Sequence, residues 1–475
     1  MSRPTPTNRW LVLAICCMSL FIVGLDVSAL NVALPSIREQ LHVSSSHLQW
    51  VLDAYTLVLA SLLMLSGSVA DRVGRRKVFR IGLVTFGIGS ILCAFAPSGE
   101  LLISARMVQA VGGSMLNPVA MSIITNTFTD ARERAQAIGF WGGTIGLSMA
   151  LGPLIGGLLV ETLGWQSVFW MNVPVVLTAL VLSTLYVPES RSEHPRTLDP
   201  AGQLLVIVVL GGATFALIEG RELGWTSVTV VGCFAAAALA LVTLVVVESR
   251  VAQPLIDPRF FASIPFSGAV VSAILGFAAQ AGFLFVTTLY LQSARGFSPL
   301  HAGLMTLPMA LGTAVMSVIS GRLVGSVGPR LPMLLSGACV SVAALALTTI
   351  SQTSSIPFLV VTYAVFGCGF GLLNAPITNA AVSGMPRHQA GVAAAVASTS
   401  RQVGSALGVA AFGTLTFSAL GSGDLSGLAS ASHAAWWAML ACGLGLIVTA
   451  IVVTLPVARR SSEHVRAALI DVPHR

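Results

Sequence analysis

The chain has 475 residues, of which 55% are hydrophobic and only 9% are charged, and its formal net charge is +7. Soluble globular domains carry about 25% charged residues, so composition excludes a soluble protein and predicts one embedded in lipid. The basic balance does not indicate nucleic-acid binding, because the charges lie in short stretches between apolar runs, as topology signals do.

Apolar stretches long enough to cross a bilayer recur along the chain. A spanning helix needs about 20 mainly apolar residues, and strands are excluded because an open sheet in lipid leaves backbone groups unpaired. The first stretch lacks a clear cleavage site, so we expect a retained helix rather than a signal peptide. The sequence thus predicts an all-α integral membrane fold with fourteen transmembrane helices, over 10–34, 47–70, 78–96, 101–125, 135–160, 166–187, 201–219, 226–247, 266–291, 300–321, 331–350, 355–380, 390–417 and 433–456.

The basic residues predict the orientation of these spans. With the N-terminus inside, Arg38, Arg221 and Arg295 fall on the outer side, Arg106 and Arg401 lie within spans, and every other Arg and the single Lys fall inside. Such a bias is typical of cytoplasmic loops. We therefore expect a multi-pass protein of the cell (inner or plasma) membrane with both termini cytoplasmic.

Two acidic residues, Asp26 in the first span and Asp53 in the second, lie within the predicted membrane region. An intramembrane charge costs about 2.5–3.5 kcal/mol on insertion scales and is a functional candidate. At about 1.5 Å of rise per residue, both acids and Arg106 of the fourth span fall in one layer of the outer leaflet, with Asn31 and Gln109 nearby. Our hypothesis is that Asp26 couples transport to protons and that Arg106 tunes it; the alternative is a structural salt-bridge layer.

The loop after the second span carries a dense motif. It reads Gly67-Ser-Val-Ala-Asp71-Arg72-Val-Gly74-Arg75-Arg76-Lys77, and a related loop, Gly321-Arg-Leu-Val-Gly325-Ser-Val-Gly328-Pro-Arg330, follows the tenth span. The second copy has Gly325 in place of the acid. The first copy is interpreted either as a conformational latch or as a topology signal alone.

The spacing of the two loops predicts an internal repeat. They lie eight helices apart, as two six-helix halves with two inserted helices require, and such repeats are typical of transporters. We predict an N-terminal half over 1–200, inserted helices over 201–250, and a C-terminal half with a cytoplasmic tail over 251–475.

The fifth span combines small residues with a proline: Gly146, Gly152, Pro153, Gly156 and Gly157. Small residues allow close helix contact, and proline kinks a helix. The functional interpretation is a bent seal against proton leak; the alternative is ordinary packing.

Polar residues in other spans could line a substrate path. The candidates are Asn31, Tyr55, Gln109, Gln280, Asn374, Arg401 and Gln402. For Arg401 with Gln402, substrate contact and stabilisation of the bundle stay equally open. For Gln280 and Asn374, interhelical hydrogen bonds are the competing interpretation.

In this order the motifs resemble the major facilitator superfamily, and specifically its fourteen-spanner drug:proton antiporters. The resemblance covers nearly the whole chain and is carried by the segments 25–35, 50–55, 67–77, 106–113 and 146–157. It implies export of small hydrophobic or cationic organic compounds, such as drugs and antibiotics, in exchange for protons. It also implies that Asp71 contacts the facing half near Ala390 and that the fifth-span string is typical of antiporters.

A nucleotide site is not expected, because the single Lys does not form the Gly-Lys-Ser/Thr sequence of a P-loop. We expect no cofactor, no metal, no catalytic residue and no enzymatic activity, and a monomer whose partners are the small-molecule substrate, protons and the lipid bilayer. Alternatives are an exporter of one endogenous metabolite or lipid, proton-symport uptake, and a non-transporting membrane sensor or enzyme.

Overall fold

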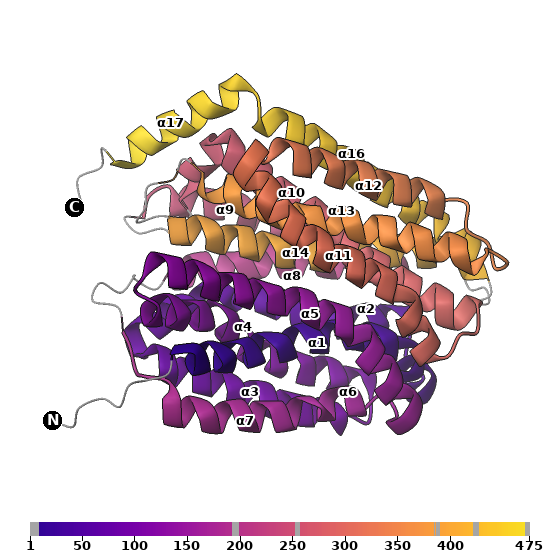
Figure 1. The fold of residues 1–475 in the computed structure, drawn as a ribbon. Coiled ribbons are helices and arrows are strands. Elements are labelled where there is room, and N and C mark those ends of the chain that lie inside the picture. Colours follow the sequence, from indigo (N-terminus) through magenta and orange to yellow (C-terminus); the bar gives the residue numbers. More distant parts are fainter. Residues whose placement is uncertain are drawn as a thin grey trace. The chain divides into compact units, whose positions relative to one another are not determined.

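The computed structural model describes residues 9–191, 199–251, 257–383, 385, 390–420 and 427–470. Every regular element in this part of the chain is a helix (Figure 1). Some predicted features lie outside it, namely the topology residues Arg3, Arg196, Arg387 and Arg475. The surroundings of Gly146 are also not described.

The chain divides into two compact units. The first comprises residues 1–198 with 298–303, and the second comprises residues 199–297 and 304–475. The helices of the first unit are α1 (Arg9–Leu41), α2 (Ser45–Val73), α3 (Arg75–Ala94), α4 (Gly99–Thr127), α5 (Ala131–Leu163), α6 (Ser167–Trp170) and α7 (Asn172–Tyr186). The remaining helices are α8 (Pro200–Leu223), α9 (Val228–Glu248), η1 (Pro258–Ala262), α10 (Ile264–Leu289), the π-helical turn η2 (Tyr290–Ala294), α11 (Pro299–Val327), α12 (Arg330–Leu347), α13 (Ile356–Val382), α14 (Ala390–Leu420), α15 (Leu428–Ala431), α16 (His433–Val453) and α17 (Pro456–Ile470).

Thirteen helical stretches in the described part are long and apolar enough to cross a membrane. The remaining predicted span corresponds to α5, a continuous helix of 33 residues whose shorter apolar part is Leu151–Leu163. The predicted all-helical membrane fold is therefore confirmed, and the predicted count of fourteen spans agrees with it.

The predicted helix ends were less accurate. α1 continues past residue 34, with Pro35 inside it, and ends at Leu41. His42 follows in the left-handed region with φ of 51°. The predicted cytoplasmic tail contains a further helix, α17, whose apolar face, Ala458, Val465 and Leu469, is buried.

The same packing partners recur in both units. In the first unit, α1 packs against α4, α5 and α7, and α3 packs against α4 and α7. In the second unit, α10 packs against α13, α14 and α16, and α12 packs against α13 and α16. Five helices of each unit correspond in this way, which agrees with the predicted internal repeat.

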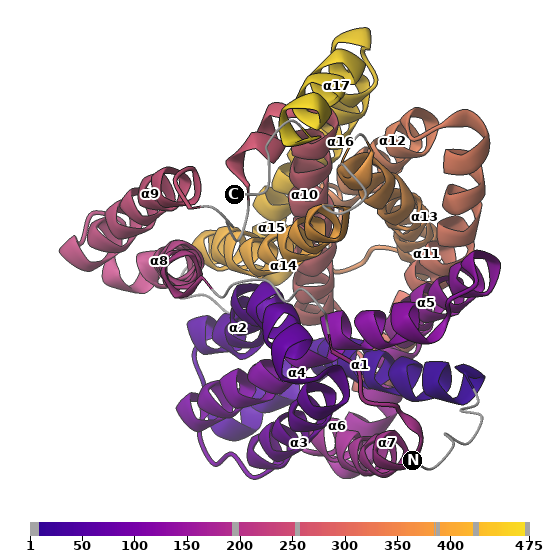
Figure 2. The same ribbon diagram turned by 90° about the vertical axis from the view of Figure 1, so that its left-hand side faces the viewer.

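The two inserted helices pair with each other within the second unit. α8 and α9 pack side by side, and α8 also contacts α14. Figure 2 shows the pair at the edge of this unit. One link between α8 and α14 is a hydrogen bond of 2.9 Å from the Thr414 hydroxyl to the Leu217 carbonyl.

Candidate functional site

A buried polar cluster surrounds Asp26 in the first unit. Its carboxylate accepts hydrogen bonds from Arg106 Nη1 at 2.6 Å, Gln109 Nε2 at 2.9 Å and Asn172 Nδ2 at 2.7 Å. These side chains are at most 1% exposed. α1 supplies the acid, α4 the Arg and Gln, and α7 the Asn, so the cluster joins three spans.

Two members of this cluster were not predicted. Ser90 of α3 accepts hydrogen bonds from Gln109 at 2.8 Å and Asn172 at 3.1 Å, and it donates to the Phe86 carbonyl at 2.9 Å. Asn172 follows the short helix α6 in the sixth predicted span. An intramembrane Asn was the only signal that the sequence offered for it.

Close approach of α3 and α4 places Gln109 in the cluster. A Cβ at Gly89 would collide with the backbone of Gln109. The absence of a side chain at Gly89 therefore lets the two backbones touch, as small residues do in membrane helix packing. Gln109 also accepts a hydrogen bond from Arg106.

Arg106 is held on several sides. Its Nε donates to the Val51 carbonyl of α2 at 3.2 Å, and its guanidinium lies 4.1 Å from the ring centroid of Tyr55 and 5.9 Å from that of Phe169. Cation–π contact and hydrogen bonding compensate for part of its desolvation. The predicted proximity of Asp26, Arg106 and Gln109 is therefore present in the structure.

Asp53 does not take part in the hydrogen bonds of this cluster. It is 0% exposed, and neither of its carboxyl oxygens has a hydrogen-bond donor among the residues that the structure describes. Asn31 also lies outside the cluster, since its Nδ2 donates to the Val27 carbonyl of its own helix at 3.0 Å. The acids of the first two spans thus have different environments.

The predicted loop 67–77 is helical except at Gly74, because α2 continues to Val73 and α3 begins at Arg75. This junction contacts the segment that follows α7. Asp71 accepts two hydrogen bonds from Arg75, at 3.0 and 3.1 Å. The Arg76 backbone N donates to Glu189 Oε1 at 3.1 Å, and Gly74 has a φ of 124° that favours glycine. Glu189 was not predicted. It accepts from the first turn of α3, where the backbone N–H groups have no helical partner.

The small residues of α5 pack against α1. A Cβ at Gly156 would lie 2.8 Å from Ala29 Cα, and one at Gly152 would collide with Ser28. The serine hydroxyl also donates to the Ser148 carbonyl at 3.3 Å. The helices therefore touch at backbone distance along this motif.

The predicted polar residues of the second unit lie on neighbouring helices. Arg401 of α14 donates to Thr378 Oγ1 of α13 at 2.7 Å, and its guanidinium lies 5.9 Å from the ring centroid of Phe277 of α10. Gln280 is buried on α10, while Asn374 on α13 and Gln402 on α14 are partly buried.

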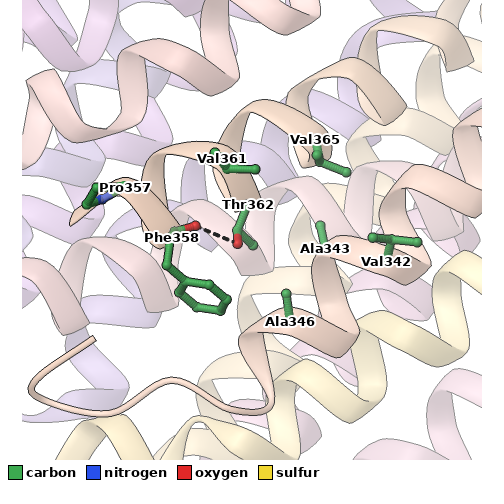
Figure 3. Close-up of a pocket in the computed structure, with 8 residues that line it drawn as sticks. All are labelled: Val342, Ala343, Ala346, Pro357, Phe358, Val361, Thr362 and Val365. Atoms are coloured by element: carbon green, nitrogen blue, oxygen red, sulfur yellow. Dashed lines mark hydrogen bonds between the residues drawn. The ribbon is translucent and has the colours of Figure 1, made fainter. Parts of the chain in front are cut away.

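An apolar groove lies between α12 and α13 (Figure 3). Its lining residues are Val342, Ala343, Ala346, Pro357, Phe358, Val361, Thr362 and Val365. The only hydroxyl among them, that of Thr362, donates to the Phe358 carbonyl at 2.7 Å. The groove therefore lacks a free polar side chain that could orient a substrate. No metal-binding group of His, Cys, Asp or Glu occurs in the described part of the chain.

Repeated packing of membrane-spanning helices in two units is typical of secondary transporters, and the first unit here also holds the buried ion pair of Asp26 and Arg106. The chain belongs to the major facilitator superfamily, whose family model matches residues 16–409.

Curated relatives cover most of the chain. It is 36% identical to the multidrug resistance protein Stp of Mycobacterium tuberculosis, over 84% of this chain and 74% of that protein. It is 37% identical to the methylenomycin A resistance protein of Streptomyces coelicolor, over 83% of each chain. It is 34% identical to the multidrug efflux pump LfrA of Mycolicibacterium smegmatis, over 86% of this chain and 81% of that protein.

A solved structure has the same fold. A bacterial homologue of the human lysosomal transporter Spinster, crystallised in an inward-facing and unoccupied conformation, matches with a TM-score of 0.64 at 18% identity. The match covers 98% of this chain and 99% of that one. At this identity the likeness concerns the fold alone.

Proposed function

We propose that this protein exports small organic compounds, drugs and antibiotics among them, across the cell membrane in exchange for protons. Membership of a transporter superfamily and similarity to relatives named for efflux and resistance support this proposal. The excess of basic residues on one side supports cytoplasmic termini. The substrate leaves chemically unchanged, and we expect a monomer without a cofactor.

The observation that supports proton coupling is the buried carboxyl group of Asp53. An ionised carboxylate without a partner in an apolar medium is strongly unfavourable, so such a group takes up a proton instead. Asp53 has no donor in the described part of the chain and is fully buried. These two observations make Asp53 the proposed proton carrier, which would exchange its proton with water when another conformation exposes it.

Asp26 plays a complementary role in the proposal. Three donors, one of them cationic, surround its carboxylate. Protonation of Asp26 would break its ion pair with Arg106. Arg106 also donates to the carbonyl of Val51, which lies two residues before Asp53 in α2. A movement of Arg106 on protonation of Asp26 would therefore alter a contact of the helix that carries Asp53.

The proton gradient supplies enough free energy for this exchange. An inward proton gains about 2.3 kcal/mol per 100 mV of membrane potential, and each pH unit adds about 1.4 kcal/mol. One proton can therefore support a gradient of about a hundredfold or more for a neutral solute.

A dedicated exporter of one metabolite is the second candidate. The observation that favours it is the similarity to a protein named for resistance to one antibiotic, methylenomycin A. Transport of several unrelated compounds by the purified protein would exclude this narrower function.

Drug-induced proton release from proteoliposomes with an acidic interior, followed with a pH-sensitive dye, tests the proposal. We expect Asp53→Asn to abolish exchange, Asp26→Asn to reduce it at least tenfold, and Glu463→Gln, which changes an exposed carboxylate of α17, to leave it unchanged. Exchange by Asp53→Asn at the wild-type rate would show that this residue does not carry the proton.

A further inference from the structure

The helices α10–α16 of the C-terminal half contain one positive charge near mid-membrane and no negative charge. No Asp or Glu occurs in α10–α16. Arg401 lies about 14 Å along α14 from Val392, where the apolar span begins, at about 1.5 Å per residue. This depth is near the middle of a hydrocarbon core about 30 Å thick.

The guanidinium of Arg401 keeps unused hydrogen-bonding capacity. Arginine has five N–H donors. Nη2 donates to the Thr378 hydroxyl, whereas the buried Nε has no acceptor in the described part of the chain. Among the described residues, no carboxylate lies within 4.0 Å of the Arg401 guanidinium to form an ion pair. A purely structural arginine would be expected to use its donors, because a buried unpaired donor is costly.

The surrounding residues fix this guanidinium in place. The Thr378 hydroxyl donates to the Asn374 carbonyl at 3.1 Å, so its lone pair faces Arg401. Phe277 lies beside the guanidinium and packs edge-on against Phe370 of α13, with ring centroids 5.1 Å apart. Three helices thus present a cation next to an aromatic ring, and Arg401 itself is only partly buried.

We infer that Arg401 is a binding site for an anionic oxygen of the exported compound, a carboxylate or an ionised phenol, with Phe277 packing against its apolar body. This inference rests on the proposed transport function and narrows its substrate class. A planar guanidinium matches a carboxylate with two parallel, charge-assisted hydrogen bonds. A cationic compound would be repelled at this site. The expectation of cationic substrates from the family resemblance therefore does not extend to this part of the protein.

Binding of two dyes with the same xanthene scaffold, anionic fluorescein and cationic rhodamine 123, tests the inference in detergent. We expect Arg401→Gln to weaken fluorescein binding at least tenfold and to leave rhodamine 123 binding unchanged or stronger. Arg401→Lys keeps the charge without the planar fork and should lose less. Thr378→Val removes only the orienting hydroxyl and should give a smaller, fluorescein-specific loss.

The matched control is Arg322→Gln, which makes the same substitution at an exposed arginine of α11. It should leave both affinities unchanged. Equal affinity of wild type and Arg401→Gln for fluorescein, absence of fluorescein binding to wild type, or an equal loss for both dyes would overturn the inference. Retention of rhodamine 123 binding excludes misfolding of a variant.

Flux measurements separate this inference from the proposed function. If fluorescein binds in an Arg401-dependent way but neither dye moves against a proton gradient, the exporter proposal fails and the binding site stands. The opposite result is that only rhodamine 123 is exported, that Arg401→Gln exports rhodamine 123 as well as wild type does, and that this variant still binds fluorescein with full affinity. The exporter proposal would then hold, and the proposed anion site at Arg401 would be wrong.

Discussion

The two acidic residues in the spans of the first unit differ in their surroundings. Asp26 accepts hydrogen bonds from three side chains on two other helices, whereas Asp53 is equally buried and has no donor in the described part of the chain. The sequence placed both in one membrane layer. Which acid pairs with Arg106 depends on the rotation of each helix about its own axis.

At this scale we predict that the ion pair of Asp26 and Arg106 behaves as a unit. Arg106→Gln leaves a buried carboxylate without its cation, and loss of one partner of a buried pair costs about 3–5 kcal/mol. We expect a clear fall in the thermal unfolding midpoint of the purified protein. The double variant Asp26→Asn with Arg106→Gln should recover much of this loss but not proton exchange. Equal midpoints for the single and double variants would contradict the prediction.

Helix packing in this protein depends on positions where backbones touch. Gly152 and Gly156 of α5 contact α1, and Gly404 and Gly408 of α14 contact α10 in the same way, since a Cβ there would lie against the backbone of Ile274 and Ala278. The two helix pairs correspond in the repeat. The sequence showed the glycines of α5 as a motif, and the structure shows that both units use the same close contact.

At the scale of these helices we predict that Gly156→Ala destabilises the protein. The added Cβ would lie 2.8 Å from Ala29 Cα, and overpacking of this kind costs about 1–3 kcal/mol. Gly211→Ala in α8 is the matched control, because nothing lies within 4 Å of its added Cβ. Thermal unfolding followed by size-exclusion chromatography should separate the two variants, and equal midpoints would show that α5 and α1 can move apart.

The junction of α2 and α3 carries an ion pair near the membrane surface rather than a backbone contact. The pair of Asp71 and Arg75 is partly exposed, with side-chain exposures of 29% and 16%, so it contributes at most about 0.5 kcal/mol to stability. If the motif is a conformational latch, Asp71→Ala will lower transport at least fivefold and leave the unfolding midpoint unchanged. Glu463→Ala is the control. If Asp71→Ala changes neither transport nor the accessibility of cytoplasmic cysteines to a thiol reagent, the motif is a topology signal alone.

The whole molecule is defined by an uneven distribution of charge over many apolar spans. Basic residues gather on one predicted side, and few charges lie within the membrane region. Because each span reverses the direction of the chain, an error in the number of spans would reverse the predicted side of every later loop. Orientation is therefore a property that can only be tested on the whole chain.

We predict that both termini face the cytoplasm. A fluorescent protein fused after residue 475 should fluoresce, and alkaline phosphatase fused there should be inactive. Fusions truncated after Trp225, in the connection between α8 and α9, should give the opposite result. Active phosphatase at the C-terminus would contradict the predicted cytoplasmic location of this end.

We also predict that transport by the intact protein follows the proton gradient. Dye accumulation in inverted vesicles should collapse on addition of an uncoupler. ATP added with the uncoupler should not restore it. Restoration by ATP would contradict proton-driven export.

The sequence by itself determined that this protein lies in a lipid bilayer, that it is helical, where its spans approximately lie and which family it resembles. The reason is that a bilayer requires long apolar helices and tolerates few charged residues within them. Only the tertiary structure decided which polar residues meet. Asn172 and Ser90 complete the cluster of Asp26, Asp53 stays apart from it, and Arg401 lies between Thr378 and Phe277. The physical reason is that lipid-facing and buried positions are equally apolar in a membrane helix, so its rotation cannot be deduced from hydrophobicity and is set by packing.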